Sequence, residues 1–351
     1  MGKINFKETE LQGQGMYEYE GTWYGLPYAP VERLMPPISP AENFKRCLDG
    51  KAFEWIPDGT CDMVDITPHC IPDVDASDYE GGIDTFGVKW VALENGLPAM
   101  VEPGKPALKD ISEWKNLAWP DVSSWDWENF GKRYQEKIGT ERIKRGVMLS
   151  SYFERLISLM DFEGAAMALV EDPEEVEEFF NKLTDYHIEV VNHYKKYFDV
   201  DVIMAHDDWA AQRSPFFSIN TVRALLVPQY KRFVQHCHNL GIYFTLHSCG
   251  NGKILAPAMI EAGIDSWQLQ QNAMDLEEVV DLYGDALGLE AYFEITQDDE
   301  AAKQFIIEQM RLFSKVKKPT ISFYDMKEER SFDVRRFIYE EARKAALTRS
   351  N

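Results

Sequence analysis

A histidine and a cysteine stand two residues apart at the end of an apolar run, in the stretch FTLHSCGNGKI at residues 244–254. On a β-strand, residues i and i+2 project from the same face about 7 Å apart, so His247 and Cys249 can share one tetrahedral zinc ion. Imidazole and thiolate are ligands that zinc prefers. A catalytic zinc site usually has three protein ligands, and the sequence indicates only this pair. The alternative is a half-buried cysteine beside a histidine that hydrogen-bonds a backbone carbonyl.

Polar residues also follow the other apolar runs of strand length in the second half of the chain. The carboxyl ends of parallel strands meet at one face, where polar side chains indicate chemistry more than packing. We predict catalytic roles for Asp207, Asp208 and His247. The residues predicted to bind a substrate are Tyr152, Trp209, Gln270, Glu294 and Tyr324.

The neighbouring carboxylates Asp207 and Asp208 cannot both face the same site, because adjacent side chains on a strand point to opposite sides. One of them is expected to act as a general acid, a metal ligand or a substrate anchor. The other is expected to cap the next helix or to face solvent. The sequence does not decide which residue takes which position.

Strands and helices alternate from residue 146 onward, which predicts βα units and a parallel sheet. The six predicted strands are 146–153, 200–208, 241–250, 264–270, 286–295 and 318–325. In the less regular first 145 residues, the stretches EWIPDG, MVDITPH and DTFGVKWVAL are candidates for the missing strands. Eight strands would close an α/β barrel of the (β/α)8 TIM type. An open doubly wound sheet is disfavoured because no glycine-rich phosphate loop follows a strand.

We expect one barrel domain over residues 1–351, with an irregular N-terminal segment at 1–60 that covers the barrel. The N-terminal half is rich in large aromatic residues, and Trp23, Tyr24, Trp55 and Trp90 are candidates for lining a pocket that accepts an aromatic ring. Most large aromatic side chains are core residues, so only two or three of these are expected to touch a ligand.

Composition limits the possible partners and the compartment. The formal net charge is −22, from 59 acidic and 37 basic residues, so nucleic acid and anionic membrane surfaces are unlikely partners. The 5 cysteines show no disulfide framework, and the sequence has neither a secretory signal pattern nor an apolar run that would span a membrane. We therefore expect free thiols and a cytoplasmic location.

Several ordered stretches together resemble the uroporphyrinogen decarboxylase superfamily, and in particular its cobalamin-dependent methyltransferase branch. They are SSYFERLISLMDFEGAAMALVEDPEEVEEFF, DVIMAHDDWAAQ, FTLHSCGN, MIEAGIDSWQLQQNAMDL and LGLEAYFEI, within residues 150–330. The resemblance implies a (β/α)8 barrel, in agreement with the strand pattern. It also implies a zinc ion bound by a His-x-Cys pair, which His247 and Cys249 match, and by a later cysteine near the last strand.

This sequence departs from that pattern, because its last predicted strand, PTISFYDMKEE, contains no cysteine. The third zinc ligand would then be Asp325, Glu294 or another carboxylate. A harder ligand set favours a Lewis-acid role toward oxygen over thiol activation.

The resemblance leaves two chemistries and one non-catalytic alternative. Decarboxylases of the superfamily grip a polycarboxylate with an arginine-rich N-terminal segment, whereas residues 20–60 here contain only Arg33 and Arg46. The methyltransferase branch implies transfer of a methyl group from a small methylated molecule, such as a methoxylated aromatic compound, to a corrinoid supplied by a partner protein. The alternatives are a lyase acting on a carboxylated substrate and a binding barrel without catalytic activity.

Overall fold

A computed structural model describes residues 7–17, 22–23, 26–27, 30–94, 97–139, 141–327 and 329–349. In this part of the chain, seven parallel strands form one curled sheet in the order β14-β13-β12-β11-β10-β9-β5. The strands are β5 (Met63–Ile66), β9 (Ile143–Met148), β10 (Val202–His206), β11 (Tyr243–Ser248), β12 (Ser266–Leu269), β13 (Gly288–Ile295) and β14 (Pro319–Asp325). The predicted α/β barrel is confirmed.

The eighth position of the barrel is occupied by a single bridge instead of a full strand. Asp58 pairs in parallel with Ile321 of β14, and the amide of Ile321 donates to the carbonyl of Pro57 at 3.0 Å. The stretch EWIPDG, a candidate for a missing strand, therefore contributes one bridge beside β14 and no full strand. MVDITPH supplies β5. DTFGVKWVAL was wrong as a barrel strand, because its residues join a separate antiparallel sheet, β6 (Gly81–Ile83), β7 (Lys89–Val91) and β8 (Met100–Val101).

The strand predicted at 146–153 is displaced toward the N-terminus. It starts at Ile143 and ends at Met148, and Tyr152 is already the first residue of the next helix. The reason is that Lys144 and Arg145 belong to the strand although they are charged. The side chain of Arg145 is buried against two carboxylates. Because a charged residue is not expected in a buried strand, the first half of this strand was not predicted.

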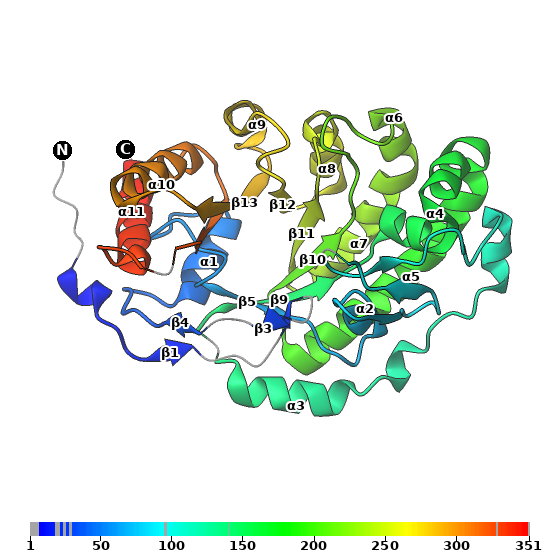
Figure 1. The fold of residues 1–351 in the computed structure, drawn as a ribbon, viewed down its shortest axis with the longest axis horizontal. Coiled ribbons are helices and arrows are strands. Elements are labelled where there is room, and N and C mark those ends of the chain that lie inside the picture. Colours follow the sequence, from blue (N-terminus) through cyan, green and yellow to red (C-terminus); the bar gives the residue numbers. More distant parts are fainter. Residues whose placement is uncertain are drawn as a thin grey trace.

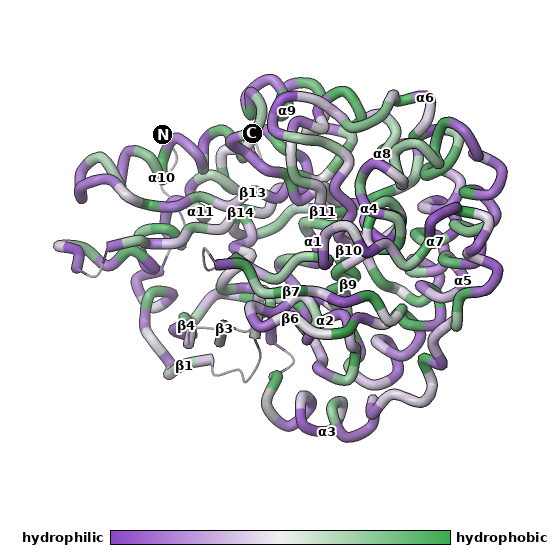
Figure 2. Tube along the Cα trace, turned by 45° about the vertical axis from the view of Figure 1, so that its right-hand side comes forward, coloured by the Kyte–Doolittle hydropathy of each residue, from purple (hydrophilic) through white to green (hydrophobic). Residues whose placement is uncertain are grey.

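Helices connect successive strands and surround the sheet (Figure 1). They are α4 (Tyr152–Glu171), α5 (Pro173–Phe198), α7 (Val227–Asn239), α8 (Ala256–Ala262), α9 (Leu276–Tyr283), α10 (Asp299–Phe313) and α11 (Val334–Arg349). Apolar and polar segments alternate along outer helices such as α10 (Figure 2), which is the pattern of helices packed on one side and solvated on the other. Helix α7 follows directly on a π-helical turn at Val222–Leu226 and has Pro228 in its first turn.

The N-terminal segment covers the amino end of the barrel. Helix α1 (Pro40–Leu48) places Ala41, Phe44 and Leu48 against the first residues of β5, β9, β10 and β11. Helix α1 therefore covers the end of the barrel where these strands begin. It does not cover the end where they finish, which carries their carboxyl ends.

The connection between β5 and β9 lies at the carboxyl end and is fixed there by a buried arginine. Arg155 of α4 binds Asp84 at 2.7 Å and Asp73 of α2 (Pro72–Ala76) at 2.9 Å. Arg155 and Asp84 have fully buried side chains. This pairing ties the connection to α4, because either charge left alone would be costly in the interior.

His187 makes the stability of the fold depend on pH. The ring is fully buried on α5 against aromatic side chains, and neither ring nitrogen has a hydrogen-bond partner. Burial lowers the pKa of His187 to about 3. In the unfolded chain its pKa is about 6.5, so between these values only the unfolded state binds a proton. The contribution of His187 is therefore complete above about pH 6.5 and decreases as the pH falls toward 3.

We expect His187→Leu to remove this component. The loss of stability on acidification, up to about 1.4 kcal/mol per pH unit for one such group, should be smaller in the variant than in the wild type. Urea unfolding at a series of pH values measures it. Val190→Ala, on the same helix, is the control and should lower the free energy of unfolding by a similar amount at every pH. An unchanged pH slope in His187→Leu would contradict the prediction.

Candidate metal centre at the barrel mouth

Strict alternation along the strands determines which polar side chains enter the barrel. On β11, His247 and every second residue before and after it point into the lumen. The same holds on the neighbouring strands for the residues in register with these. The apolar residues between them contact the helices. The polar lumen-facing residues are Asp65, Arg145, His206, Asp208, Thr245, His247, Cys249, Ser266, Gln268, Gln270, Glu290, Tyr292, Glu294, Thr320, Ser322 and Tyr324.

Strand register then brings four of these residues into one row. His206 pairs with His247, His247 with Gln268, and Gln268 with Glu290. The rings of His206 and His247 lie 4.4 Å apart between centroids, with an angle of 30° between their planes. The imidazole Nδ1 of His247 lies 2.7 Å from Oε1 of Gln268. The row crosses four neighbouring strands at the same level of the barrel.

A buried ion-pair network supports this row from below. Arg145 donates to both carboxylate oxygens of Asp65 at 2.6 and 2.9 Å, and to Oε1 of Glu290 at 2.7 Å. Tyr292 and Gln268 also donate to Oε1 of Glu290, at 2.8 and 2.7 Å. Burial raises the pKa of Glu290, but the charge of Arg145 and these hydrogen bonds outweigh it, so the pKa lies below its usual value. Glu290 is therefore ionised.

Three side chains meet above this network, at the carboxyl ends of β10 and β11. The imidazole Nε2 of His247 lies 3.2 Å from Sγ of Cys249 and 3.8 Å from Oδ1 of Asp208. The backbone amide of Cys249 donates to the same Asp208 oxygen at 2.7 Å. One ligand atom from each residue lies within 4.8 Å of the other two, and all three residues are half-buried. Among the described residues, these three form the one group of at least three potential metal ligands.

The environment favours a protonated thiol while no cation is bound. Burial first, and then the charges of Asp208 and Glu154, raise the pKa of Cys249 to about 12. Burial and the charges of Asp208 and Asp207 also raise the pKa of Glu154, whose carboxylate accepts from the backbone amide of Asp208 at 3.3 Å. A cation bound between these side chains would favour their ionised forms and so reverse this effect.

The residues fit a zinc ion. Zinc–nitrogen and zinc–sulfur bonds of about 2.0 and 2.3 Å place two tetrahedral ligand atoms about 3.5 Å apart, close to the 3.2 and 3.8 Å separations of His247 from its two neighbours. Nitrogen, sulfur and oxygen donors from three residues leave a fourth position open. Asp208 would supply the carboxylate. Asp325, one of the expected third ligands, is paired with Arg330 at 2.7 Å instead.

The turn after β11 requires Gly250. Its φ is +75°, and a Cβ atom would lie 2.1 Å from the carbonyl oxygen of Ala210. The amide of Gly250 donates to Oε1 of Gln270 at 2.7 Å, and Nε2 of Gln270 reaches Gln212 at 3.3 Å. Gln270, predicted to bind a substrate, therefore lies beside the cluster and holds the loop that presents Cys249.

The structure places Asp207 on the other side of its strand, away from the cluster. Its carboxylate accepts from the amides of Phe153 and Glu154 at the start of α4, and from Trp209 and Tyr230. The residue is fully buried, and burial raises its pKa to about 6. Asp207 thus caps α4, which precedes it in the sequence, instead of the next helix that was considered for one of the two aspartates, and Asp208 faces the mouth.

Two predicted substrate-binding residues also lie outside the lumen. Trp209 is fully buried and its indole donates to Asp207 at 2.9 Å. Tyr152 is fully buried at the start of α4, where its hydroxyl contacts Thr184 at 2.9 Å. Neither side chain reaches the cluster, because each faces the helix layer.

Glu294 and Tyr324 lie at the rim. Glu294 is exposed at the lumen-facing end of β13. The ring of Tyr324 is stacked on Tyr292 with centroids 5.9 Å apart and is 43% exposed, so a flat aromatic surface is accessible there. Of the N-terminal aromatics, Trp55 is buried and donates to Asp62. The half-buried Trp90 donates to Asp84. Tyr24 and the side chain of Trp23 lie outside the described residues.

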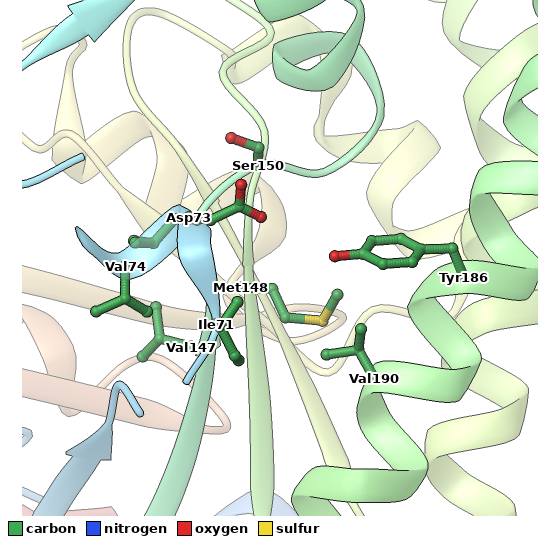
Figure 3. A pocket seen from close by; sticks show the side chains of 9 residues that line it. Ile71, Asp73, Val74, Val147, Met148, Ser150, Tyr186 and Val190 are labelled. Atoms are coloured by element: carbon green, nitrogen blue, oxygen red, sulfur yellow. The ribbon is translucent and has the colours of Figure 1, made fainter. Parts of the chain in front are cut away.

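A small pocket lies next to the carboxyl end of β9, between α2 and α5 (Figure 3). It is lined by Ile71, Asp73, Val74, Val147, Met148, Leu149, Ser150, Tyr186 and Val190. The figure shows the polar ends of Asp73 and Ser150 together at one side and aliphatic side chains at the other. The Asp73 carboxylate is already paired with Arg155 at 2.9 Å, so the pocket offers no unpaired charge to a ligand.

Sequence reasoning missed Asp65, Arg145, Glu154, Glu290 and Tyr292. Asp65 and Arg145 lie on β5 and β9, whose polar residues show no such period. Glu290 and Tyr292 lie on β13, where the polar residues Glu290, Tyr292 and Glu294 recur with a period of two. That alternation was the available signal. Glu154 lies on a helix, and nothing in its local sequence distinguishes it from a surface glutamate.

Comparison with known proteins supports this description of the fold. Residues 135–289 match the family model described as Uroporphyrinogen decarboxylase (URO-D). The matched segment contains β9 to β12 and the residues Asp208, His247 and Cys249. The resemblance to this family is thus confirmed over that segment. Among curated proteins, none matches the sequence.

One solved structure shows the same architecture. A methyltransferase from Methanosarcina mazei aligns with a TM-score of 0.63 and 14% sequence identity, over 90% of this chain and 100% of that chain. At this identity the likeness establishes the fold, which is a URO-D-like (β/α) barrel. D-psicose 3-epimerase from Clostridium cellulolyticum H10, with D-tagatose, gives a TM-score of only 0.37 at 8% identity, over 69% of this chain and 86% of that chain. No helix in the described residues is long and apolar enough to cross a membrane.

We predict that the protein binds about one zinc ion per chain through Asp208, His247 and Cys249. Elemental analysis after loading with zinc and removal of excess metal measures the stoichiometry. His247→Ala and Cys249→Ala should each lose the ion. Cys70→Ala changes another half-buried cysteine outside the cluster and should keep it. Full zinc content in both cluster variants would contradict the site.

We also predict that Arg145→Leu destabilises the fold by about 3–5 kcal/mol, because it leaves the buried charges of Asp65 and Glu290 without a partner. Lys45→Leu is the comparison, since the Lys45–Asp201 pair lies nearer the surface and should contribute about 1 kcal/mol or less. Chemical denaturation of the three proteins gives the free energies of unfolding. Equal losses in the two variants would contradict the role of the network.

Proposed function

We propose that the protein is a methyltransferase that moves a methyl group from a small methylated molecule, of the methoxylated aromatic class, to the cobalt of a separate corrinoid protein. The observation that carries the proposal is the cluster of Asp208, His247 and Cys249 at the open end of a URO-D-like barrel. Three ligands and one open position are typical of a catalytic rather than a structural zinc site.

In transfer of a methyl group from an aryl methyl ether, the leaving group is an oxide, which leaves poorly unless its oxygen is protonated or bound to a cation. The cobalt(I) electron pair forms the new cobalt–carbon bond, the carbon–oxygen bond breaks, and its electron pair remains on oxygen. That oxygen takes up one proton and leaves as a phenol. A zinc ion held by the cluster would supply Lewis-acid stabilisation at this oxygen. The chain's own residues must place the ether oxygen at the cluster and leave the methyl carbon accessible from the mouth.

The aromatic rim supports the class of donor. The exposed ring of Tyr324 is stacked on Tyr292 and offers a flat surface to an aromatic ring. Glu294 lies at the end of β13 and is the proposed polar contact of the donor, whereas the amide of Gln270 is already bound to Gly250 and Gln212. The corrinoid must approach from the open side of the barrel, because α1 closes the other end.

A carboxylated substrate is less well supported. Decarboxylation of such a compound needs cations to hold its carboxylates. On the described barrel strands, Arg145 is the single arginine or lysine that faces the lumen. Its charge is already neutralised by Asp65 and Glu290. A lyase reaction would therefore have to hold its substrate without an unpaired lumen cation.

The proposal predicts methylcobalamin as a product. Zinc-loaded protein is incubated with a panel of aryl methyl ethers and cob(I)alamin, which serves as the probe for the partner corrinoid. Absorption spectra follow methylcobalamin, and chromatography follows the free phenol. Cys249→Ala and His247→Ala should lose at least about 100-fold in rate, because each removes a ligand of the Lewis acid, and Cys70→Ala should retain the activity. Release of carbon dioxide from a carboxylated substrate without corrinoid, and no methyl transfer to cobalt, would contradict the proposal.

A further inference from the structure

The hydrogen bonds around Gln268 define the orientation of its side-chain amide. Its Nε2 lies 2.7 Å from Oε1 of Glu290 and 2.5 Å from the hydroxyl of Tyr292. The Glu290 carboxylate is paired with Arg145 and carries no proton to donate. A flipped amide would therefore place an oxygen against a carboxylate oxygen. The nitrogen of Gln268 must face Glu290, and its oxygen must face His247.

This orientation determines which nitrogen of His247 carries the proton. Oε1 of Gln268 only accepts hydrogen bonds, and it lies 2.7 Å from Nδ1 of His247. Nδ1 must therefore be the donor. In the neutral ring, Nε2 then has a free lone pair, and this atom is the one that lies 3.2 Å from Cys249 and 3.8 Å from Asp208. The ring of His206, packed at 4.4 Å, further restrains the ring of His247.

The amide itself is held in place by charges on three other strands. Arg145 on β9 binds Glu290 on β13 at 2.7 Å and Asp65 on β5 at 2.6 Å. The three side chains are at most 16% exposed, so water competes little for these contacts. The orientation of the Gln268 amide therefore follows from an ion-pair network that spans the barrel lumen.

We propose that Gln268 is a positioning residue that fixes His247 as the Nδ1-protonated tautomer, so that Nε2 is directed to the metal position. The inference rests on the proposed function, because the cluster is its metal centre. It also adds a second role to the network of Arg145, Asp65 and Glu290, which determines the amide orientation in addition to stabilising the barrel. A hydrogen bond of this kind to a metal-binding histidine raises its basicity and removes the need to reorient the ring on binding.

Nitrogen-15 NMR of the metal-free protein tests the tautomer directly. Protein labelled at histidine is compared with His247→Ala to assign the ring signals. The proposal predicts a protonated Nδ1 and an unprotonated Nε2 for neutral His247. The opposite tautomer in the wild type would overturn the proposal. This readout needs neither zinc nor activity.

Variants of β12 test the consequence for metal binding. Gln268→Met keeps the length of the side chain but cannot accept from Nδ1, and its zinc affinity in a chelator competition should fall about 10–100-fold. Ser266→Ala, two residues earlier on the same face, is the matched control. Its Oγ has no hydrogen-bond partner, so the affinity should remain that of the wild type.

The double variant Gln268→Glu with Glu290→Gln tests whether another acceptor at position 268 can replace the glutamine. It preserves the net charge and an acceptor for Nδ1, and should restore both the tautomer and most of the affinity. If Gln268→Met fails to fold, the zinc affinity of the double variant and the tautomer seen in the wild-type spectrum still test the proposal. Wild-type affinity in Gln268→Met together with an unchanged tautomer would overturn the inference alone. A wild type that binds no zinc would instead overturn the metal centre of the proposed function.

Discussion

The pairing of Arg145 with Asp65 and Glu290 is the interaction on which the inner barrel depends. Two carboxylates on β5 and β13 face the lumen, where a charge without a partner is costly. One guanidinium between them satisfies both through charged hydrogen bonds of 2.6–2.9 Å. Such a buried network is a weak source of stability compared with an apolar core, but it specifies geometry. Here the geometry that it specifies is that of the residues directly above it.

The candidate site is built in two levels on this network. The lower level contains side chains that only hydrogen-bond to one another, and it ends at Gln268 and His247. The upper level contains Asp208, His247 and Cys249, whose ligand atoms converge at the mouth. Loop residues after β11 complete the arrangement, since Gly250 permits a turn that a larger residue would block. A cation held there would be rigidly directed, and Tyr324 is exposed at the rim nearby.

Most of the fold was predictable from the sequence, and so was the central pair. Alternating strands and helices predicted the barrel, and the spacing of His247 and Cys249 on a strand predicted that they share a face. Three features were not predictable in this way. The strand at Ile143–Met148 was shifted because a buried Arg145 resembled a surface charge. Asp207 and Asp208 could not be told apart, because the side that each faces depends on register. The third potential ligand stayed open between Asp325, Glu294 and another carboxylate, because the sequence alone does not show which carboxylate packs beside His247 and Cys249.

The proposed metal centre is tested most directly by spectroscopy, because a measurement of activity does not identify the atoms bound to the ion. X-ray absorption at the zinc edge of the zinc-loaded protein reports the atoms bound to the ion. One sulfur at about 2.3 Å and lighter atoms at about 2.0 Å are predicted, with the sulfur absent in Cys249→Ala. A shell of nitrogen and oxygen atoms alone in the wild type, or an unchanged sulfur in the variant, would contradict the account.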